Sequence, residues 1–403
     1  MIVALALTYA VFAVLLNSVG TVMLQSIESF HVTKVAASSL EGFKDLSIAA
    51  TSFLLAAQLP RFGLRRAMIV ALALVAAACL AMPLVPGFWT TRLLFLAIGV
   101  AFGVTKVSVY SFVGLLTDDS ARHASLLNVI EGVFMLGAFS GYWVFAAFID
   151  PVTPGNRQWL GVYYVLAAAS LIALTLLATT PFDESGVGES AQSTQNIWQK
   201  FVKMILLVFR PLSLSFICAI FFSVLVEQGV QSWLPTFNRE LLGLSAPMSV
   251  QATSIFTLCQ VAGRLGASVV VRRTGWFLLV LGGLVGMAAL IISVLPLAAA
   301  HHGQVTSWAG APAAAFLFPM IGLLMAPIYP ALNSAVLSSI APTERPAMVG
   351  LIVVFSALGG TIGSFVVGHV FAAFQSTIAF YVLLIPIAAL AAASTMVRRK
   401  TVR

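Results

Sequence analysis

The stretch Pro60–Arg66, PRFGLRR, is a short basic loop between two apolar segments of the chain. A second basic loop, Arg272–Gly275 (RRTG), lies about half the chain further on and also separates two apolar segments. Each loop contains a glycine, which permits a tight reversal of the chain. The two loops therefore indicate a chain built from two halves of similar construction.

The composition outside these loops is that of a membrane protein. Of the 403 residues, 60% are hydrophobic and 8% are charged, whereas soluble proteins carry about 25% charged residues. Apolar segments of about 20 residues or more, each long enough to span a bilayer, recur along the whole chain. They fall at 2–25, 35–59, 67–86, 92–116, 125–149, 161–179, 211–236, 249–271, 277–300, 310–340, 348–372 and 377–397. We therefore expect an all-α polytopic membrane protein with twelve transmembrane helices in two six-helix bundles.

The longest polar interruption, at 180–210, divides these segments six and six. It predicts an N-terminal bundle at 1–179, a cytoplasmic linker at 180–210, a C-terminal bundle at 211–397 and a basic tail at 398–403. Within the linker, residues 197–203 have the alternation of apolar and charged residues that is typical of an interfacial amphipathic helix.

The loop charges predict the orientation of the chain. Fourteen of the 21 Lys and Arg residues fall in segments on the side of the two termini, and four fall in loops on the other side. Because cytoplasmic loops carry the excess of positive charge, we expect both termini in the cytoplasm and the chain in a bacterial inner membrane. The net charge of +8 is spread over short loops without a basic tract, which argues against nucleic-acid binding. The three cysteines lie in separate apolar segments, so neither a disulfide framework nor a metal site is expected.

Seven charged residues fall inside the expected helices. Charged groups at membrane depth are costly and normally face a protein interior or a watery cavity. Four acids against three bases leave one carboxyl group uncompensated, and such a group is suited to carrying a proton. The seven are Glu41, Lys44, Asp45, Lys106, Glu131, Glu227 and Arg264.

Two groups of these charges are candidates for proton coupling. The first candidate is Glu131, with Lys106 as the counter-charge that modulates it. A permanent Lys106–Glu131 salt bridge is the structural alternative. The second candidate is Asp45 or Glu41 with Lys44, which share one helix face at i, i+3 and i+4. This second group either belongs to a transport pathway or forms a buried structural ion cluster.

Polar side chains at membrane depth are candidates for binding a solute. Amides and a carboxylate offer hydrogen bonds to a polyhydroxyl ligand, and an indole offers a flat face to a sugar ring. The alternative is hydrogen bonding between helices, a Trp at the membrane interface, and an Arg264 that pairs with an acid. The expected contacts are Asn17, Lys106, Asn128, Glu227, Gln228, Gln231, Trp233, Gln260, Arg264 and Asn333.

The first basic loop resembles the signature Gly-x-x-x-Asp-Arg-x-Gly-Arg-Arg of the major facilitator superfamily, with Pro60 in place of the acid. Three further stretches, Phe112–Leu116, Asn128–Ala138 and Ala326–Asn333, resemble the L-fucose permease type of sugar:proton symporter. The resemblance implies two bundles that alternate access to a substrate at mid-membrane. It also implies that the seven charges lie on helices that line or adjoin the central cavity. It implies conformational roles for Arg61, Gly63, Arg65, Arg66 and Gly275.

The chain departs from the fucose permease pattern at the charged positions. The acid of the family's first helix falls on Thr21, the acid of its fourth helix on Lys106, and the glutamine of its fifth helix on Glu131. The departures imply a rearranged proton coupling and do not support fucose as the substrate, while Lys106 and Arg264 leave room for a sugar acid or another small anion.

We therefore expect a secondary active transporter that couples protons to the symport of a sugar or sugar-like small polar solute. The alternatives are proton-driven efflux of drugs or metabolites, and transport of a small organic anion. The expected partners are the solute, the proton and the lipid bilayer, and the protein is expected to be a monomer without a cofactor. No nucleophile–base constellation or phosphate-binding loop in the sequence indicates an enzyme.

Overall fold

The computed structural model describes residues 1–55, 59–116, 120–180, 204–301, 303–374 and 376–401. Regular structure within these ranges is helical, apart from an isolated bridge between Leu244 and Val305. The amphipathic helix expected at 197–203, and most of the linker around it, lie outside these ranges.

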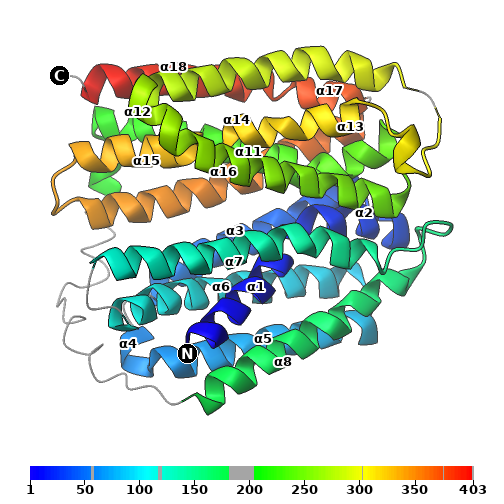
Figure 1. Ribbon diagram of the computed structural model, residues 1–403, viewed down its shortest axis with the longest axis horizontal. Helices are drawn as coiled ribbons and strands as arrows, with labels where there is room; N and C mark the ends of the chain where they lie inside the picture. The colour runs from blue at the N-terminus through cyan, green and yellow to red at the C-terminus, as the bar shows by residue number, and fades with distance from the viewer. Residues whose placement is uncertain (56–58, 117–119, 181–203, 302, 375, 402–403) are drawn as a thin grey trace. The chain divides into compact units, whose positions relative to one another are not determined.

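The chain divides into two compact units, one made of Met1–Val32 with Leu40–Thr194, the other of Thr33–Ser39 with Gln195–Arg403. In the first unit, α5 packs against both α6 and α8, and α1 packs against α7 (Figure 1). Its elements are α1 (Ile2–Asn17), α2 (Val19–Phe30), most of α3 (Lys34–Leu55), α4 (Leu59–Phe62), α5 (Leu64–Leu84), α6 (Phe88–Leu116), α7 (Ser120–Ala146), η1 (Arg157–Gly161) and α8 (Val162–Thr179).

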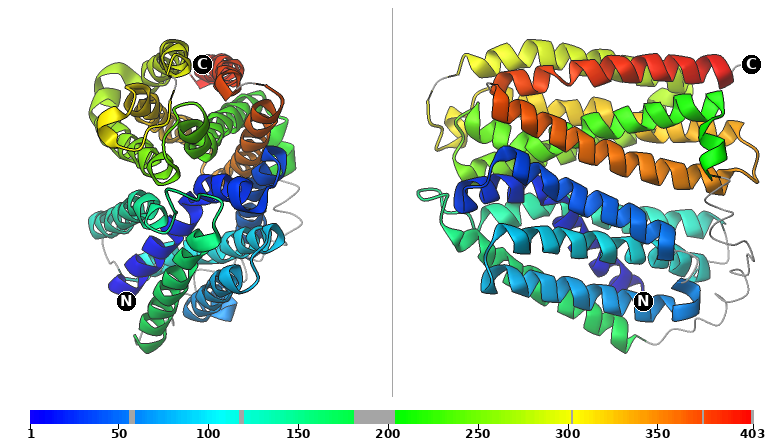
Figure 2. Two further views of the ribbon diagram at one scale, coloured as in Figure 1. Left: turned by 90° about the vertical axis from the view of Figure 1, so that its right-hand side faces the viewer. Right: turned by 180° about the vertical axis from the view of Figure 1, so that it is seen from behind.

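In the second unit, α11 lies beside α16 (Figure 2) and also packs against α18. Its elements are α11 (Pro211–Glu240), α12 (Ala246–Ala299), η2 (Trp308–Gly310), α13 (Ala314–Leu317), η3 (Phe318–Met320), α14 (Ile321–Met325), α15 (Ile328–Ser339), α16 (Arg345–Ala373), α17 (Ser376–Tyr381) and α18 (Leu384–Thr401).

The described helices agree with the twelve expected spans once three features are taken into account. Nine helical stretches are each long and apolar enough to cross a membrane, and α1 and α2 form a further span bent by 46°. The 54 residues of α12 contain a break at Gly275 and therefore hold two of the expected spans. Helix α3 is 22 residues long and is the remaining expected span. Because it carries Glu41, Lys44 and Asp45, it is not among the nine helical stretches that are apolar enough to be recognised as spans by composition.

Both glycines of the basic loops adopt backbone angles that favour glycine. Gly63 has φ 93° where α4 ends and α5 begins, and Gly275 has φ 74° at the break in α12. A residue with a Cβ is strained at such angles. The tight reversals expected from the sequence are therefore formed at both places.

Small residues bring α3 and α6 of the first unit into backbone contact. A Cβ placed on Gly99 of α6 would lie 2.4 Å from the carbonyl oxygen of Lys44, and one on Gly103 would lie 2.9 Å from the Cβ of Thr51. Helices in membranes associate through such close packing at small residues. The glycines thus hold the charged part of α3 directly against α6.

Candidate functional site

The first candidate site is formed by one turn of α6 and the facing part of α7. Lys106 and Tyr110 are exposed and stand one turn apart on α6, and Glu131 of α7 is half-buried. The hydroxyl of Tyr110 donates a hydrogen bond to Oε1 of Glu131 over 3.0 Å. Asn128, also exposed, lies three residues before Glu131 and therefore on the same helix face.

Lys106 and Glu131 interact electrostatically without forming a direct ion pair. Their charges are close enough to influence each other, yet none of the ion pairs among the described side chains joins them. The permanent salt bridge, considered above as the structural alternative, is therefore not formed. Tyr110, which was not among the expected site residues, is the hydrogen-bond partner of Glu131 instead. Tyr110 could have been found from the sequence, because it follows Lys106 by four residues and therefore lies on the same helix face.

Aromatic rings form the core behind this site. Tyr9 of α1 packs against Phe102 of α6 and Phe134 of α7, with ring centroids 6.2 and 5.8 Å apart. The Tyr9 hydroxyl is buried, has no hydrogen-bond partner among the described residues, and interacts electrostatically with Glu131. The rings therefore fix α1, α6 and α7 against one another and leave the polar groups of α6 and α7 on the accessible side.

A buried ion triad occupies one face of α3. Nζ of Lys44 lies 2.7 Å from Oε1 of Glu41 and 3.3 Å from Oδ1 of Asp45. The one ammonium group thus serves two carboxylates, and all three side chains are almost entirely buried. This geometry agrees with the structural ion cluster, although the triad keeps one net negative charge when all three groups are ionised.

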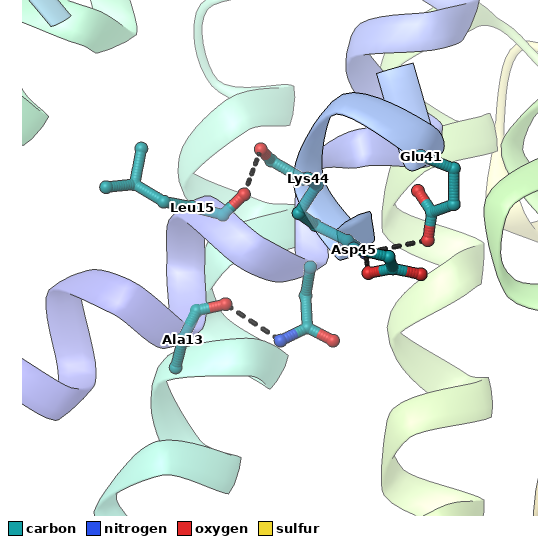
Figure 3. A network of polar contacts seen from close by, with 7 residues as sticks. Ala13, Leu15, Glu41, Lys44 and Asp45 are labelled. Carbon is teal, nitrogen blue, oxygen red and sulfur yellow. Dashed lines mark hydrogen bonds and ion pairs between the residues drawn. The ribbon is translucent and has the colours of Figure 1, made fainter. Parts of the chain in front are cut away.

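The triad belongs to a polar network at the bend between α1 and α2 (Figure 3). At this bend the side-chain amide of Asn17 donates to the carbonyl oxygen of Ala13 over 2.8 Å, and the Ser18 hydroxyl donates to that of Leu15 over 2.7 Å. Carbonyls near a helix end need such partners. Asn17 therefore supports the bend.

A second candidate site lies between α11 and α12 in the second unit. The amide of Gln260 donates to Oε1 of Glu227 over 2.9 Å, which joins the two helices. Gln228 and Gln231 are half-buried on α11, and Arg264 is exposed on α12 one turn after Gln260. Asn333 of α15 is half-buried, and its Oδ1 has no hydrogen-bond partner in the part of the chain that the structure describes.

The structure corrects the expected role of Trp233. Its indole is fully buried, its Nε1 donates to the carbonyl oxygen of Ser364 over 2.9 Å, and its ring stacks on Phe371 with centroids 5.3 Å apart. The ring therefore packs α11 against α16 and has no face available to a solute. Trp233 packs helices together, and we do not retain it as a residue that contacts the solute.

The basic loop of the first unit is tied to the end of α8. Nε of Arg65 donates to the carbonyl oxygen of Leu177 over 2.8 Å, and Nη2 donates to that of Ala178. A cation at a helix C-terminus also complements the helix dipole. Arg66 is exposed, and the side chain of Arg61 lies outside the described part of the structure.

No residue set in the described ranges suggests a metal site or a disulfide. Groups of three His, Cys, Asp or Glu side chains that could hold a metal ion are absent there. Cys79, Cys218 and Cys259 are free thiols on different helices.

The family model of the Major Facilitator Superfamily matches residues 5–364. The chain belongs to this superfamily. As a major facilitator protein it is a multi-pass membrane transporter and not an enzyme, and the expected fold of twelve helices in two bundles is confirmed. No curated protein sequence matches the chain.

Solved structures of other major facilitator proteins resemble this one along their whole length. A mutant form of the nucleoside transporter NupG is 13% identical, with a TM-score of 0.76 over 98% of both chains. The xylose transporter XylE from E. coli is 15% identical, with a TM-score of 0.69 over 99% of this chain and 95% of that one. FucP in its outward conformation is 17% identical, with a TM-score of 0.62 over 99% and 98%. At such identities the likeness shows the fold alone. FucP represents the fucose permease type that the sequence resembles.

Proposed function

We propose that this transporter couples protons to the symport of a sugar or sugar-like small polar solute, including sugar acids, by alternating access. The observation that carries the proposal is the grouping of Lys106, Tyr110 and Glu131 on two membrane spans. The carboxylate is near a cation but not tied to it, so it can take up a proton without breaking an ion pair. A buried pair in direct contact would resist protonation because separating it is costly.

The same geometry suggests how proton and solute would be coupled. While Glu131 is ionised, its charge partly offsets that of Lys106. Protonation removes this offset and leaves the ammonium group of Lys106 accessible to a negative group or a hydroxyl oxygen of the solute. Proton binding and solute binding then favour each other, as linked equilibria must.

Further polar residues are proposed to contact the solute. All of them except the buried Gln260 are accessible or half-buried, and their hydrogen-bonding groups suit a polyhydroxyl ligand. The relatives support this class of ligand, since XylE is named for xylose and NupG for nucleosides. The residues are Asn17, Asn128, Glu227, Gln228, Gln231, Gln260, Arg264 and Asn333.

A small organic anion is the second candidate substrate. Lys106 favours it, because this cation is exposed on a membrane span and has no carboxylate within ion-pairing distance in the described part of the chain.

The triad of Glu41, Lys44 and Asp45 is the second candidate for proton coupling. For the remaining features we propose both termini in the cytoplasm of a bacterial cell, a monomeric transporter, and a conformational role for Arg65 at the end of α8.

The test is uptake of labelled sugars, sugar acids and small carboxylates into proteoliposomes, with and without an inward proton gradient. We expect accumulation of at least one of these solutes only with the gradient. Glu131→Gln is expected to abolish accumulation while sparing exchange of solute across the membrane. Unchanged gradient-driven uptake by this variant would exclude Glu131 as the carrier, and Asp45→Asn would then test the triad. Accumulation without any gradient would refute proton coupling.

A further inference from the structure

A cavity of about 300 Å³ lies in the first unit, lined by residues of α4, α5 and α6 that include none of the polar residues described above. Its walls are apolar throughout, and Val70 and Leu74, which are 57% and 41% exposed, form part of an open rim. The lining residues are Leu59, Phe62, Ala67, Val70, Ala71, Leu74, Val100, Ala101 and Val104.

Water is an unsuitable occupant of this cavity. Cavities lined only by apolar side chains stay dry, because a water molecule needs polar partners. An empty cavity is also unfavourable, since the wall atoms lose their packing contacts. Val70 and Leu74 are exposed apolar side chains on the membrane span α5, and such side chains suit a surface that faces hydrocarbon. A lipid acyl chain is therefore the occupant that suits this cavity.

A cation stands on the helix face that carries Val70 and Leu74. Arg66 is exposed in the first turn of α5, four residues before Val70 and hence on the same helix face. Unlike Arg65, which is bound to the end of α8, Arg66 forms no ion pair with any side chain that the structure describes. The guanidinium fork of arginine matches the oxygens of a phosphate group.

We propose that this cavity binds one acyl chain of an anionic glycerophospholipid, whose phosphate pairs with Arg66. The apolar walls select a hydrocarbon chain, and the arginine on the helix face of Val70 and Leu74 selects a negatively charged headgroup. The site includes none of the residues proposed for solute or proton binding. It is therefore tested without any transport measurement.

The experiment is lipid binding to the purified, delipidated full-length protein, measured by native mass spectrometry. The probes are phosphatidylglycerol and phosphatidylcholine with the same acyl chains. We expect Arg66→Gln to weaken the tightest phosphatidylglycerol site roughly fivefold, the loss typical of one surface arginine, and to leave phosphatidylcholine unchanged. Val104→Phe fills the cavity and is expected to weaken both lipids. The matched control is Arg273→Gln in the other basic loop, which should change neither.

Two results would overturn the proposal. One is equal binding of phosphatidylglycerol by the wild type and Arg66→Gln, and the other is full retention of both lipids by Val104→Phe. If Val104→Phe does not fold, as judged by gel filtration and circular dichroism, Ala71→Leu fills the same cavity with a smaller change and takes its place.

Discussion

Replacement of Lys44 by methionine tests how much the triad on α3 stabilises the protein. The ammonium group lies 2.7 Å from one carboxylate and 3.3 Å from the other, and the side chains of Lys44, Glu41 and Asp45 are 6%, 1% and 11% exposed. At an effective dielectric constant of about 20, these distances correspond to attractions of roughly 6 and 5 kcal/mol. The net loss is smaller, because the buried ammonium no longer has to be desolvated. Removing one partner of a buried pair costs about 3–5 kcal/mol, which is the decrease we expect in the free energy of unfolding.

The matched control is Lys34→Met in the second unit. Lys34 pairs with Glu240 at the same distance of 2.7 Å, but the two side chains are 21% and 30% exposed. Pairs of this kind contribute about 0.2–1 kcal/mol, so burial and not distance sets the difference between the two variants. A third variant, Glu41→Gln/Lys44→Met/Asp45→Asn, removes all three charges of the triad and is expected to recover most of the lost stability.

The assay is denaturant-induced unfolding in mixed micelles, followed by far-ultraviolet circular dichroism. We expect a large loss for Lys44→Met, a small loss for Lys34→Met, and recovery in the triple variant. An equal loss in the two single variants would refute the importance of burial. If the triple variant does not recover, the triad contributes stability beyond the neutralisation of its own buried charges.

Three further predictions concern other parts of the chain. Gly363→Ala would place a Cβ 2.2 Å from the carbonyl oxygen of Leu225, so we expect a loss of about 1–3 kcal/mol in the unfolding assay, whereas Gly282→Ala, with nothing within 4 Å, should lose none. Tyr110→Phe removes the hydrogen bond to Glu131, so we expect gradient-driven uptake to fall several-fold while exchange is spared; uptake equal to that of the wild type would separate Tyr110 from coupling. In the loop after α7, hydrogen bonds from the Thr153 side chain and from the backbone of Val152 and Thr153 hold the pKa of Asp150 below its usual value. The ionised carboxylate therefore stabilises the loop, and this contribution is lost as the pH falls through the lowered pKa of Asp150. Protection of the Val152 and Thr153 amides from hydrogen exchange should disappear over the same pH range. In Asp150→Ala this protection should be absent at every pH.

Much of the fold could be predicted from the sequence, because hydropathy and loop charge are local properties. The apolar segments and the reversals at Gly63 and Gly275 follow from residue type and spacing. The bend between α1 and α2 was not predicted, since no proline or glycine stands at Asn17 or Ser18.

The partners of the candidate residues were harder to predict than their positions. Periodicity places Lys106 and Glu131 on membrane spans, but which group meets the carboxylate depends on how α6 and α7 pack, and that group is Tyr110. Trp233 shows the same limit, because its neighbours in the sequence, Gln228 and Gln231, suggested a polar surface while its ring packs against Phe371 of a distant helix. The triad on α3 was predictable because its partners are only one turn apart.

The contact of Gly99 and Gly103 with α3 has a mechanical consequence. Because Gly99 and Gly103 present no side chain to α3, and Lys44 and Thr51 lie directly against them, we expect α3 to slide or rotate only together with α6. The residue that follows Gly103 by three positions is Lys106, so displacement of the triad is passed to this lysine through rigid helix backbone. Substitutions in the triad and at Lys106 should therefore be non-additive in double-mutant cycles, although no side-chain contact between them is required.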